Sequence, residues 1–135
     1  MTTLDAPSLK PAVAAAIDEL KKQFGDQVQV TELGDGGCRI VVEEVELGLP
    51  YSQASTWIGF TITPLYPYAD IYPHFVRPDL RRIDDRPLGE GLHKDNNFYG
   101  QPAVMVSRRT RAFGADTPNN ALIKLLKVQA WLKSL

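Results

Sequence analysis

A glycine-rich turn at residues 34–37, with the sequence Gly-Asp-Gly-Gly, constrains the fold of this chain more than any other feature. It separates residues 27–33, in which apolar and polar residues alternate, from a second apolar stretch at residues 38–47. Glycine adopts the positive φ values that tight hairpin turns require, and alternation is typical of a strand with one buried face. The pattern therefore predicts two antiparallel strands joined at this turn.

A helix is predicted before this hairpin. Ser8 can cap its first turn, Pro11 suits the first helical turn, and Gly25 is expected to end it. The apolar residues that recur at helical spacing are Val13, Ile17, Leu20 and Phe24. This spacing places them on one face of an amphipathic helix.

A second helix is predicted near the end of the sequence. Thr117 is its expected cap, and Pro118 occupies the expected first helical position. The apolar residues at helical spacing are Leu122, Leu125, Val128 and Leu132. The lysines expected to face water are Lys124, Lys127 and Lys133. This division of apolar and charged residues is typical of a helix that packs on a domain core.

The middle of the chain combines a third strand with less regular segments. Residues 56–63 are rich in aromatic and branched apolar residues and predict a strand. Four prolines between positions 64 and 78 allow at most an interrupted edge strand around residues 72–77. Residues 79–114 show no clear period and predict a long irregular segment. We therefore expect a single α+β domain, residues 1–135, with an antiparallel meander of about four strands.

The composition fits one domain and argues against several classes of protein. Of the 135 residues, 44% are hydrophobic, which is enough for a core. The formal net charge of -1 argues against disorder and against a strongly basic nucleic-acid-binding surface. No apolar run approaches the roughly 20 residues needed to cross a bilayer, and the first residues lack the pattern of a secretion signal. We expect a cytoplasmic protein with no nucleic-acid or membrane partner.

The cysteine and histidine content limits the metal chemistry of the chain. Cys38 is the only cysteine, so it can form neither an internal disulfide nor a cysteine-based zinc site. Two histidines, His74 and His93, are too few to indicate a metal site, and we expect no metal or cofactor. Cys38 is expected to be a small buried apolar residue. His74 is expected to be a hydrogen-bonded residue of the edge strand.

Two short segments carry a resemblance to a known superfamily. Residues 66–73, Tyr-Pro-Tyr-Ala-Asp-Ile-Tyr-Pro, are similar to the YPxxxP-type segment that follows the third strand of ubiquitin-conjugating (E2-like) proteins, with a wider spacing between the prolines. Residues 92–96, Leu-His-Lys-Asp-Asn, are similar to the His-Pro-Asn element of that family, without its proline and with an added residue. Residues 100–109, which end in Ser-Arg-Arg, resemble the divergent bacterial E2-like families. The resemblance implies a UBC-like fold with a long active-site segment before the C-terminal helix.

The resemblance also implies a chemistry. An E2 accepts the activated C-terminal carbonyl of a ubiquitin-like protein from an E1-like adenylating enzyme and passes it to an amine. The family's cysteine position falls near Ala103, where this chain has no thiol. Ser107 is then the candidate acceptor, as an oxyester, in a bacterial ubiquitin-like conjugation pathway. The implied partners are the E1-like adenylating enzyme, the ubiquitin-like protein and a deconjugating peptidase.

Four polar residues are candidates to assist Ser107. A hydroxyl is a weaker nucleophile than a thiolate, so Ser107 needs a general base or help from the E1 site; His93 is the candidate base and Asp95 its orienter. Asn96 or Asn97 would stabilise the oxyanion, and the spacing does not choose between them. Ser107 and His93 are equally consistent with ordinary loop residues that hydrogen-bond locally.

Arginines gather in the second half of the chain. Seven of the eight lie within residues 77–111, together with five acidic residues. The candidate partner-binding residues are Arg81, Arg82, Arg108 and Arg109. They form either a docking patch for an acidic or glycine-tailed protein, or an internally paired surface without a binding role.

Three functions from different classes remain open at this point. The chain is a non-thiol E2 that carries the modifier on Ser107, a catalytically inactive E2 variant that binds the E1 or the ubiquitin-like protein as a scaffold, or an unrelated small α+β binding domain. The position of the Ser107 hydroxyl relative to a cleft, to His93 and to an asparagine amide distinguishes the first function from the second.

Overall fold

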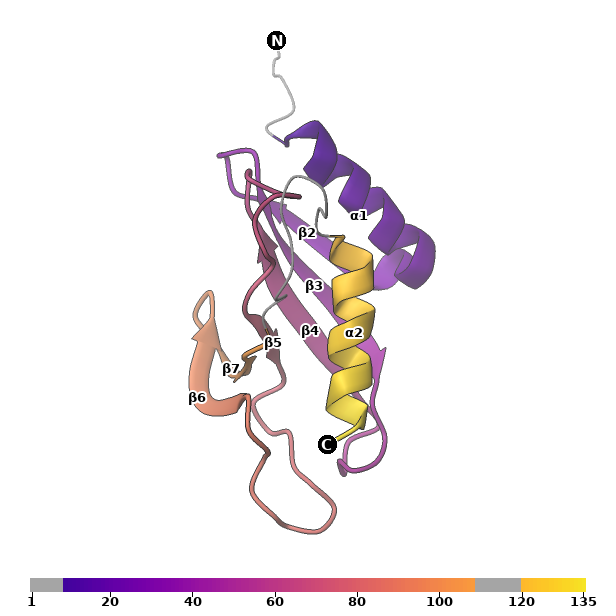
Figure 1. Cartoon of the computed structure of the whole chain (residues 1–135), viewed down its shortest axis with the longest axis vertical. Helices are drawn as coiled ribbons and strands as arrows, with labels where there is room; N and C mark the ends of the chain where they lie inside the picture. The colour runs from indigo at the N-terminus through magenta and orange to yellow at the C-terminus, as the bar shows by residue number, and fades with distance from the viewer. Residues whose placement is uncertain (1–8, 109–119) are drawn as a thin grey trace.

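Two helices lie on one face of an antiparallel sheet in the computed structural model of this protein (Figure 1). The structure describes residues 9–108 and 120–135. The elements are α1 (Pro11–Phe24), the 3-10 turn η1 (Gly25–Gln27), β2 (Val28–Glu32), β3 (Cys38–Glu46), β4 (Ser55–Ile62), β5 (His74–Val76), β6 (Leu92–Phe98), β7 (Gln101–Val106) and α2 (Ala121–Lys133). The predicted α+β class is confirmed. Neither described helix has the length and apolar character needed to cross a membrane.

The strands of the described chain form one six-stranded sheet in the order β2-β3-β4-β5-β7-β6. Every neighbouring pair is antiparallel. Strands β2 to β5 follow the order of the chain, but β5 pairs with β7 rather than with β6. The β6–β7 hairpin therefore joins the sheet through its second strand, and β6 lies at the edge. The predicted antiparallel meander of about four strands corresponds to β2 to β5, and the β6–β7 hairpin, which was not predicted, brings the sheet to six strands.

Helix α1 forms where the sequence predicts it. Pro11 occupies its first turn, and Gly25, with a φ of 60°, ends it. The buried residues of the helix are Val13, Ala16, Ile17 and Leu20. Phe24 is only partly buried against the core, and Ser8, the predicted cap, lies outside the described residues.

The hairpin between β2 and β3 confirms the prediction made from the glycine-rich turn. Gly34 and Gly36 have φ values of 84° and 101°, which side chains with a Cβ rarely adopt. The backbone N of Gly37 donates to Oδ1 of Asp35 at 2.8 Å and fixes the turn. Strand β3 then begins at Cys38, as predicted.

Alternation along the central strands gives the sheet two different faces. In β3 and β4, the side chains of Ile40, Ile58 and Phe60 have no exposed surface and join a single core cluster with both helices. The residues between them, such as Val41 and Trp57, are half-buried on the opposite face. The helices cover the first face only (Figure 1).

Strand β5 lies inside the sheet, so the prediction of an edge strand around residues 72–77 is wrong. It pairs with β4 on one side and with β7 on the other. Pro73 and Pro78 fall outside the strand, so their missing N–H groups remove no hydrogen bond from the ladder. His74 is consequently buried rather than at an edge, and neither ring nitrogen has a hydrogen-bond partner among the described residues.

Of the segment 79–114, the described part, residues 79–108, is more regular than predicted, because it contains the β6–β7 hairpin. Tyr99 and Gly100 form its two-residue turn, with φ values of 51° and 86°. In β6 only Leu92 and Phe98 are buried. An edge strand with water on one face needs few apolar residues, so hydrophobic periodicity does not reveal it.

Helix α2 begins at Ala121, and Asn120 is its cap. The Oδ1 atom of Asn120 accepts a hydrogen bond from the backbone N of Ile123 at 2.9 Å. An asparagine that accepts from this turn satisfies one of the free N–H groups of the helix start. Thr117 and Pro118, the predicted cap and first residue, lie outside the described residues.

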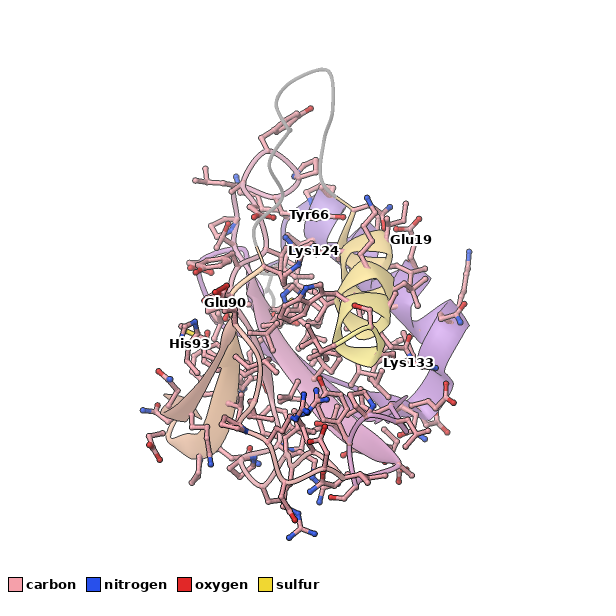
Figure 2. All side chains as sticks on the ribbon, turned by 60° about the horizontal axis from the view of Figure 1, so that its bottom comes forward. Glu19, Tyr66, Glu90, His93, Lys124 and Lys133 are labelled. Atoms are coloured by element: carbon pink, nitrogen blue, oxygen red, sulfur yellow. The ribbon has the colours of Figure 1, made fainter. Side chains whose placement is uncertain are left out.

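Lys124 is buried, so the prediction that it faces water is wrong. It lies within the buried stripe of α2 that also contains Ala121, Leu125, Val128 and Leu132. Its Nζ atom lies 3.0 Å from Oδ1 of Asp70. Figure 2 shows Lys124 near the start of α2, on the same side as Tyr66. Lys127 and Lys133 are exposed, as predicted.

Candidate functional site

A pocket of about 430 Å³ lies between the segment 80–88 and the first residues of β6. Its apolar lining residues are Leu80, Pro87, Leu88 and Leu92. Its charged or titratable lining residues are Arg81, Arg82, Arg86, His93, Lys94 and Asp95. The pocket thus combines apolar surface with several cationic side chains, and it brings together two predicted partner-binding arginines and two predicted catalytic residues.

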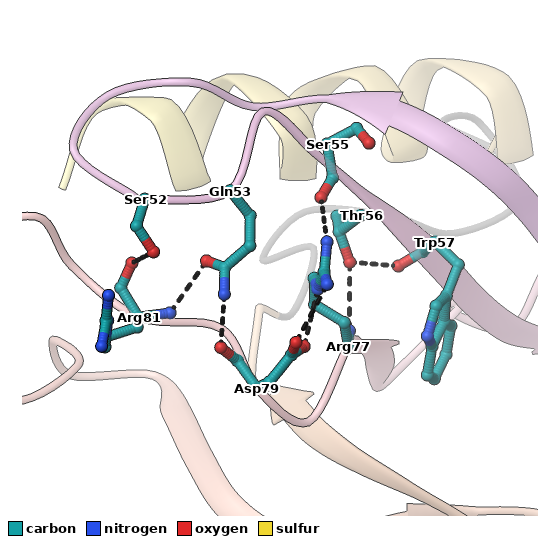
Figure 3. A network of polar contacts seen from close by, with 8 residues as sticks. All are labelled: Ser52, Gln53, Ser55, Thr56, Trp57, Arg77, Asp79 and Arg81. Atoms are coloured by element: carbon teal, nitrogen blue, oxygen red, sulfur yellow. Dashed lines mark hydrogen bonds and ion pairs between the residues drawn. The ribbon is translucent and has the colours of Figure 1, made fainter.

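Hydrogen bonds to residues 50–53 fix the wall of the pocket that carries Arg81. The backbone N of Ser52 donates to the carbonyl O of Arg81 at 2.8 Å. The backbone N of Arg81 donates to Oε1 of Gln53 at 3.1 Å, and the Nε2 atom of Gln53 donates to the carbonyl O of Asp79 at 2.5 Å (Figure 3). These bonds hold the backbone of Arg81 and leave its guanidinium exposed beside the pocket.

Arg77 anchors the start of the same wall. Its Nε atom lies 2.6 Å from Oδ1 of Asp79, and its Nη1 atom donates to the carbonyl O of Ser55 at 3.0 Å (Figure 3). The backbone N of Arg77 donates to Oγ1 of Thr56 at 3.0 Å. The hydrogen bond from Arg77 lowers the pKa of the Asp79 carboxyl. Arg77 therefore has a structural role, and the carboxylate of Asp79 compensates its charge.

Arg82 forms a two-point ion pair with Asp84. The Nε and Nη2 atoms of Arg82 each lie 3.0 Å from a carboxylate oxygen of Asp84. The backbone N of Arg86 also donates to Asp84, at 3.0 Å. The hydrogen bond from Arg82 is the main reason that the pKa of Asp84 falls to about 2. The pair shapes the 82–86 loop and neutralises Arg82 as a docking charge.

Three other cations of the pocket have no ion-pair partner among the described residues. Arg81, Arg86 and Lys94 are exposed, and the four ion pairs of the described chain involve none of them. Asp95 is the carboxylate that lines the pocket, so the three cations exceed the local acidic charge. Guanidinium and ammonium groups of residues that line one pocket are suited to bind carboxylate or phosphate groups.

Ser107 does not line this pocket. Its side chain is half-buried, and its Oγ atom accepts a hydrogen bond from the hydroxyl of Tyr72 at 3.1 Å. Its backbone N donates to the carbonyl O of Gly91 at 2.7 Å, one residue before β6 begins. The residue predicted to be the acceptor is therefore held at the end of the β6–β7 ladder, outside the cationic pocket.

His93 and Asp95 reach the pocket but are not arranged as a catalytic pair with Ser107. His93 is exposed and lies opposite Met105 in the strand register, and Figure 2 shows it on the outer side of β6. Asp95 has a φ of 63° and occupies a register shift of β6. In the described structure no hydrogen bond joins His93 to Asp95 or to Ser107.

Asn96 and Asn97 use their side-chain amides on the hairpin backbone. The Nδ2 atom of Asn96 donates to the carbonyl O of His93 at 3.1 Å and to that of Lys94 at 3.2 Å. The Oδ1 atom of Asn97 accepts from the backbone N of Gly100 at 3.3 Å. Asn96 pairs with Ala103, which is four residues before Ser107 and so, at roughly 3.3 Å per residue, about 13 Å from it along the strand.

The remaining predicted residues fall away from the pocket or outside the described chain. The guanidinium carbon of Arg108 lies 4.9 Å from the ring centre of Trp131 in α2, so this arginine stacks on a helix. Arg109 lies outside the described residues. Cys38 is fully buried, as predicted, and burial is the main reason that the pKa of its thiol rises to about 11. A thiol with a raised pKa and no exposure is a poor nucleophile.

Sequence reasoning missed two of the three cations that matter for the pocket. Arg86 and Lys94 are separated by seven residues and lie on different walls, so neither spacing nor periodicity connects them. The signal that was available is the local excess of arginine around position 81 together with a lysine beside His93. These residues come together where segment 80–88 lies against the first residues of β6.

Within residues 9–108 and 120–135, no group of three or more histidine, cysteine, aspartate or glutamate residues is arranged to hold a metal ion. Comparison with protein-family models, with curated proteins and with solved structures gives no match for this chain. The likeness to E2 proteins therefore rests on the residues already described, and the site has to be interpreted from its own geometry.

Proposed function

We propose that this chain is an E2-like binding subunit of a ubiquitin-like conjugation pathway that holds a protein partner without carrying the acyl group. The partner is the ubiquitin-like protein or its adenylating enzyme. The single observation that carries the proposal is that Arg81, Arg86 and Lys94, each without a described ion-pair partner, line one pocket. Such a surface favours recognition of an anionic protein segment.

The E2-like part of the proposal is supported by the order of the elements. A helix, an antiparallel meander, the segment with the sequence YPYADIYP and a closing helix follow one another as in the superfamily that the sequence resembles. The proline-aromatic segment, residues 66–73, lies between β4 and β5. The UBC-like fold and the pathway are therefore proposed together.

Neither candidate nucleophile has the surroundings that acyl transfer requires. Cys38 is buried in the core. Ser107 lies outside the pocket and accepts a hydrogen bond from Tyr72, while the amides of Asn96 and Asn97 bind the hairpin backbone. Acyl transfer needs a base and oxyanion donors within hydrogen-bond reach of the nucleophile, and these groups do not provide them.

An oxyester carrier is the second candidate function, and one observation favours it. The hydrogen bond from Tyr72 holds the Ser107 hydroxyl in a defined position beside Gly91. In this reaction the Oγ atom of Ser107 attacks the activated carbonyl carbon and its proton passes to a base, while the bond from that carbon to AMP or to the E1 thiol breaks and AMP or the thiolate leaves. His93, two residues along β6 from Gly91, is the candidate base.

A trapping experiment separates the two functions. The chain is incubated with ATP, the adenylating enzyme and the ubiquitin-like protein encoded by neighbouring genes, and products are separated with and without thiol reductant. The binding subunit forms a complex but no covalent adduct, and Ser107→Ala changes neither. A reductant-resistant, hydroxylamine-sensitive adduct that disappears in Ser107→Ala establishes the oxyester carrier instead.

A binding experiment tests the pocket itself. Arg81→Glu/Arg86→Glu is expected to weaken association with the partner and to reduce its salt dependence, because two docking charges are reversed. Lys21→Glu/Lys22→Glu is the matched control, since both lysines are exposed on α1 and make the same change in net charge. An equal loss of affinity for the partner in the two variants would show that the pocket is not the binding site. The lack of an adenylating enzyme and a ubiquitin-like protein among neighbouring genes would favour an unrelated binding domain.

A further inference from the structure

Two exposed aliphatic side chains lie on segments that adjoin the basic pocket. Leu49 is 72% exposed and Ile83 is 59% exposed. Their segments are paired, because the backbone N of Ile83 donates to the carbonyl O of Pro50 at 2.9 Å and Tyr51 forms an isolated bridge with Arg82. Ile83 directly follows Arg81 and Arg82, which line the pocket, so both aliphatic side chains belong to segments beside it.

The segment that carries Leu49 is anchored to the core. Tyr51 is 2% exposed, and its hydroxyl donates to the carbonyl O of Leu132 in α2 at 2.9 Å. The backbone N of Tyr51 donates to the carbonyl O of Gly48 at 3.0 Å and closes a turn around Leu49. An apolar side chain on an anchored turn is presented to a partner with little loss of backbone entropy on binding.

The chemistry of the pocket narrows the class of ligand. Free inorganic phosphate would use the cations but not the apolar lining residues Leu80, Leu88 and Leu92. Single-stranded nucleic acid is usually bound through aromatic side chains, and among the described lining residues only His93 has an aromatic ring. A peptide with carboxylate and aliphatic side chains uses both parts of the surface.

We propose that this surface binds an acidic segment of the partner protein in which carboxylate and aliphatic side chains alternate. Its carboxylates contact Arg81, Arg86 and Lys94, and its aliphatic side chains contact Leu49 and Ile83. The inference rests on the proposed function and adds to it the chemistry of the segment that the partner presents. Charge complementarity selects the segment, and apolar contact adds affinity.

Fluorescence anisotropy of the full chain tests the inference directly. The probe is a labelled peptide in which glutamates alternate with leucines, and its controls contain glutamine for glutamate or serine for leucine. Arg81→Glu/Arg86→Glu is expected to weaken probe binding about tenfold, and Leu49→Ser/Ile83→Ser about fivefold. Lys21→Glu/Lys22→Glu is expected to leave the affinity within about twofold.

Controls keep the result independent of folding. Arg81→Gln/Arg86→Gln removes the charges without reversing them, and circular dichroism verifies that each variant retains the wild-type fold. Arg82 is left unchanged in all variants, because its ion pair with Asp84 shapes the loop. A folded Gln variant that binds the probe as well as the wild type overturns the inference.

Three further outcomes also overturn it. They are equal affinity for the glutamine peptide, equal affinity for the serine peptide, and displacement of the probe by a short oligonucleotide or by inorganic phosphate at lower concentration than by unlabelled peptide. If the probe fails while Arg81→Glu/Arg86→Glu still weakens association with the conjugation partner, the proposed function stands and only the acidic segment is rejected. If neither binding depends on the pocket, both proposals fail.

Discussion

The Nζ atom of Lys124 lies 3.0 Å from Oδ1 of Asp70, and the two side chains are 9% and 8% exposed. A buried ion pair of this kind joins helix α2 to the proline-aromatic segment before β5. Removal of one partner leaves the other charge in a poorly solvated site, which costs far more than the net contribution of the pair.

Lys124→Met is therefore expected to lower the free energy of unfolding by about 3 to 5 kcal/mol, because the Asp70 carboxylate loses this cation while it remains buried. Urea denaturation measures the change. Lys127→Met is the matched control, since Lys127 is exposed on the same helix. The double variant Lys124→Met/Asp70→Asn is expected to recover part of the loss. A Lys124→Met protein as stable as the control contradicts the buried pair.

His74 is expected to make the fold sensitive to acid. Burial is the main reason that its pKa falls from 6.5 to about 3, and Lys124 lowers it further while Asp70 opposes the shift. Between these pH values the unfolded chain binds a proton at this residue that the folded chain does not. Stability therefore falls as the pH falls through this window, with a slope of about 1.4 kcal/mol per pH unit.

Urea denaturation of wild type and His74→Leu between pH 7 and pH 4 measures this contribution. The difference in stability between the two proteins is expected to shift in favour of His74→Leu as the pH falls, whatever the stability of the variant at pH 7. Carboxylates such as Asp79 and Asp84 contribute equally to both proteins and cancel in the difference. A difference that stays constant with pH would show that His74 titrates normally in the folded state.

Gly91→Ala is expected to disturb the contact between β6 and α2. Gly91 has a φ of 87°, and a Cβ atom at this position would lie 2.8 Å from Cη2 of Trp131. Backbone strain and the clash together are expected to cost about 2 to 4 kcal/mol and to change the fluorescence of Trp131. Gly34→Ala is the control, because Gly34 has a φ of 84° but no neighbour within 4 Å. Equal losses in both variants would mean that Trp131 moves aside freely.

Phe98→Ala is expected to loosen the β6–β7 hairpin and with it the pocket wall that carries Lys94. Phe98 is 4% exposed, its ring centre lies 5.0 Å from that of Phe75, and a Cβ atom at Gly59 would lie 2.6 Å from its ring. Loss of this ring is expected to cost about 3 to 5 kcal/mol. Tyr99→Ala is the comparison, because Tyr99 is 50% exposed, and its loss is expected to be smaller. Hydrogen exchange of the β6 amides locates the effect.

The sequence predicts the elements whose signals are local. The turn at residues 34–37 and helix α1 follow from glycine positions and from apolar spacing, and both are confirmed. Strand β6 is not predicted, because its residues are polar and its partner β7 supplies the apolar side of the hairpin. The edge position of β5 is wrong because no local signal indicates that a distant hairpin pairs with it.

The burial of Lys124 and the pocket were not predicted, because both depend on contacts between segments that are separate in the sequence. Lys124 lies within the apolar stripe of α2, but the carboxylate that makes its burial tolerable is 54 residues earlier in the chain. Arg81 and Lys94 are 13 residues apart and line one pocket because segment 80–88 lies against the first residues of β6. The ion pair and the pocket thus each combine residues from two segments, and neither segment alone indicates the other.

The irregularity of β6 at Asp95 has a consequence for self-association. β6 is an outer strand, and such a strand offers free N–H and C=O groups to another molecule. The extra residue between His93 and Asn96, with Asp95 in a left-handed conformation, interrupts that row of groups, and Lys94 and Asp95 add charge. The same irregularity that lies beside the pocket thus makes β6 a poor partner for strand addition by another molecule.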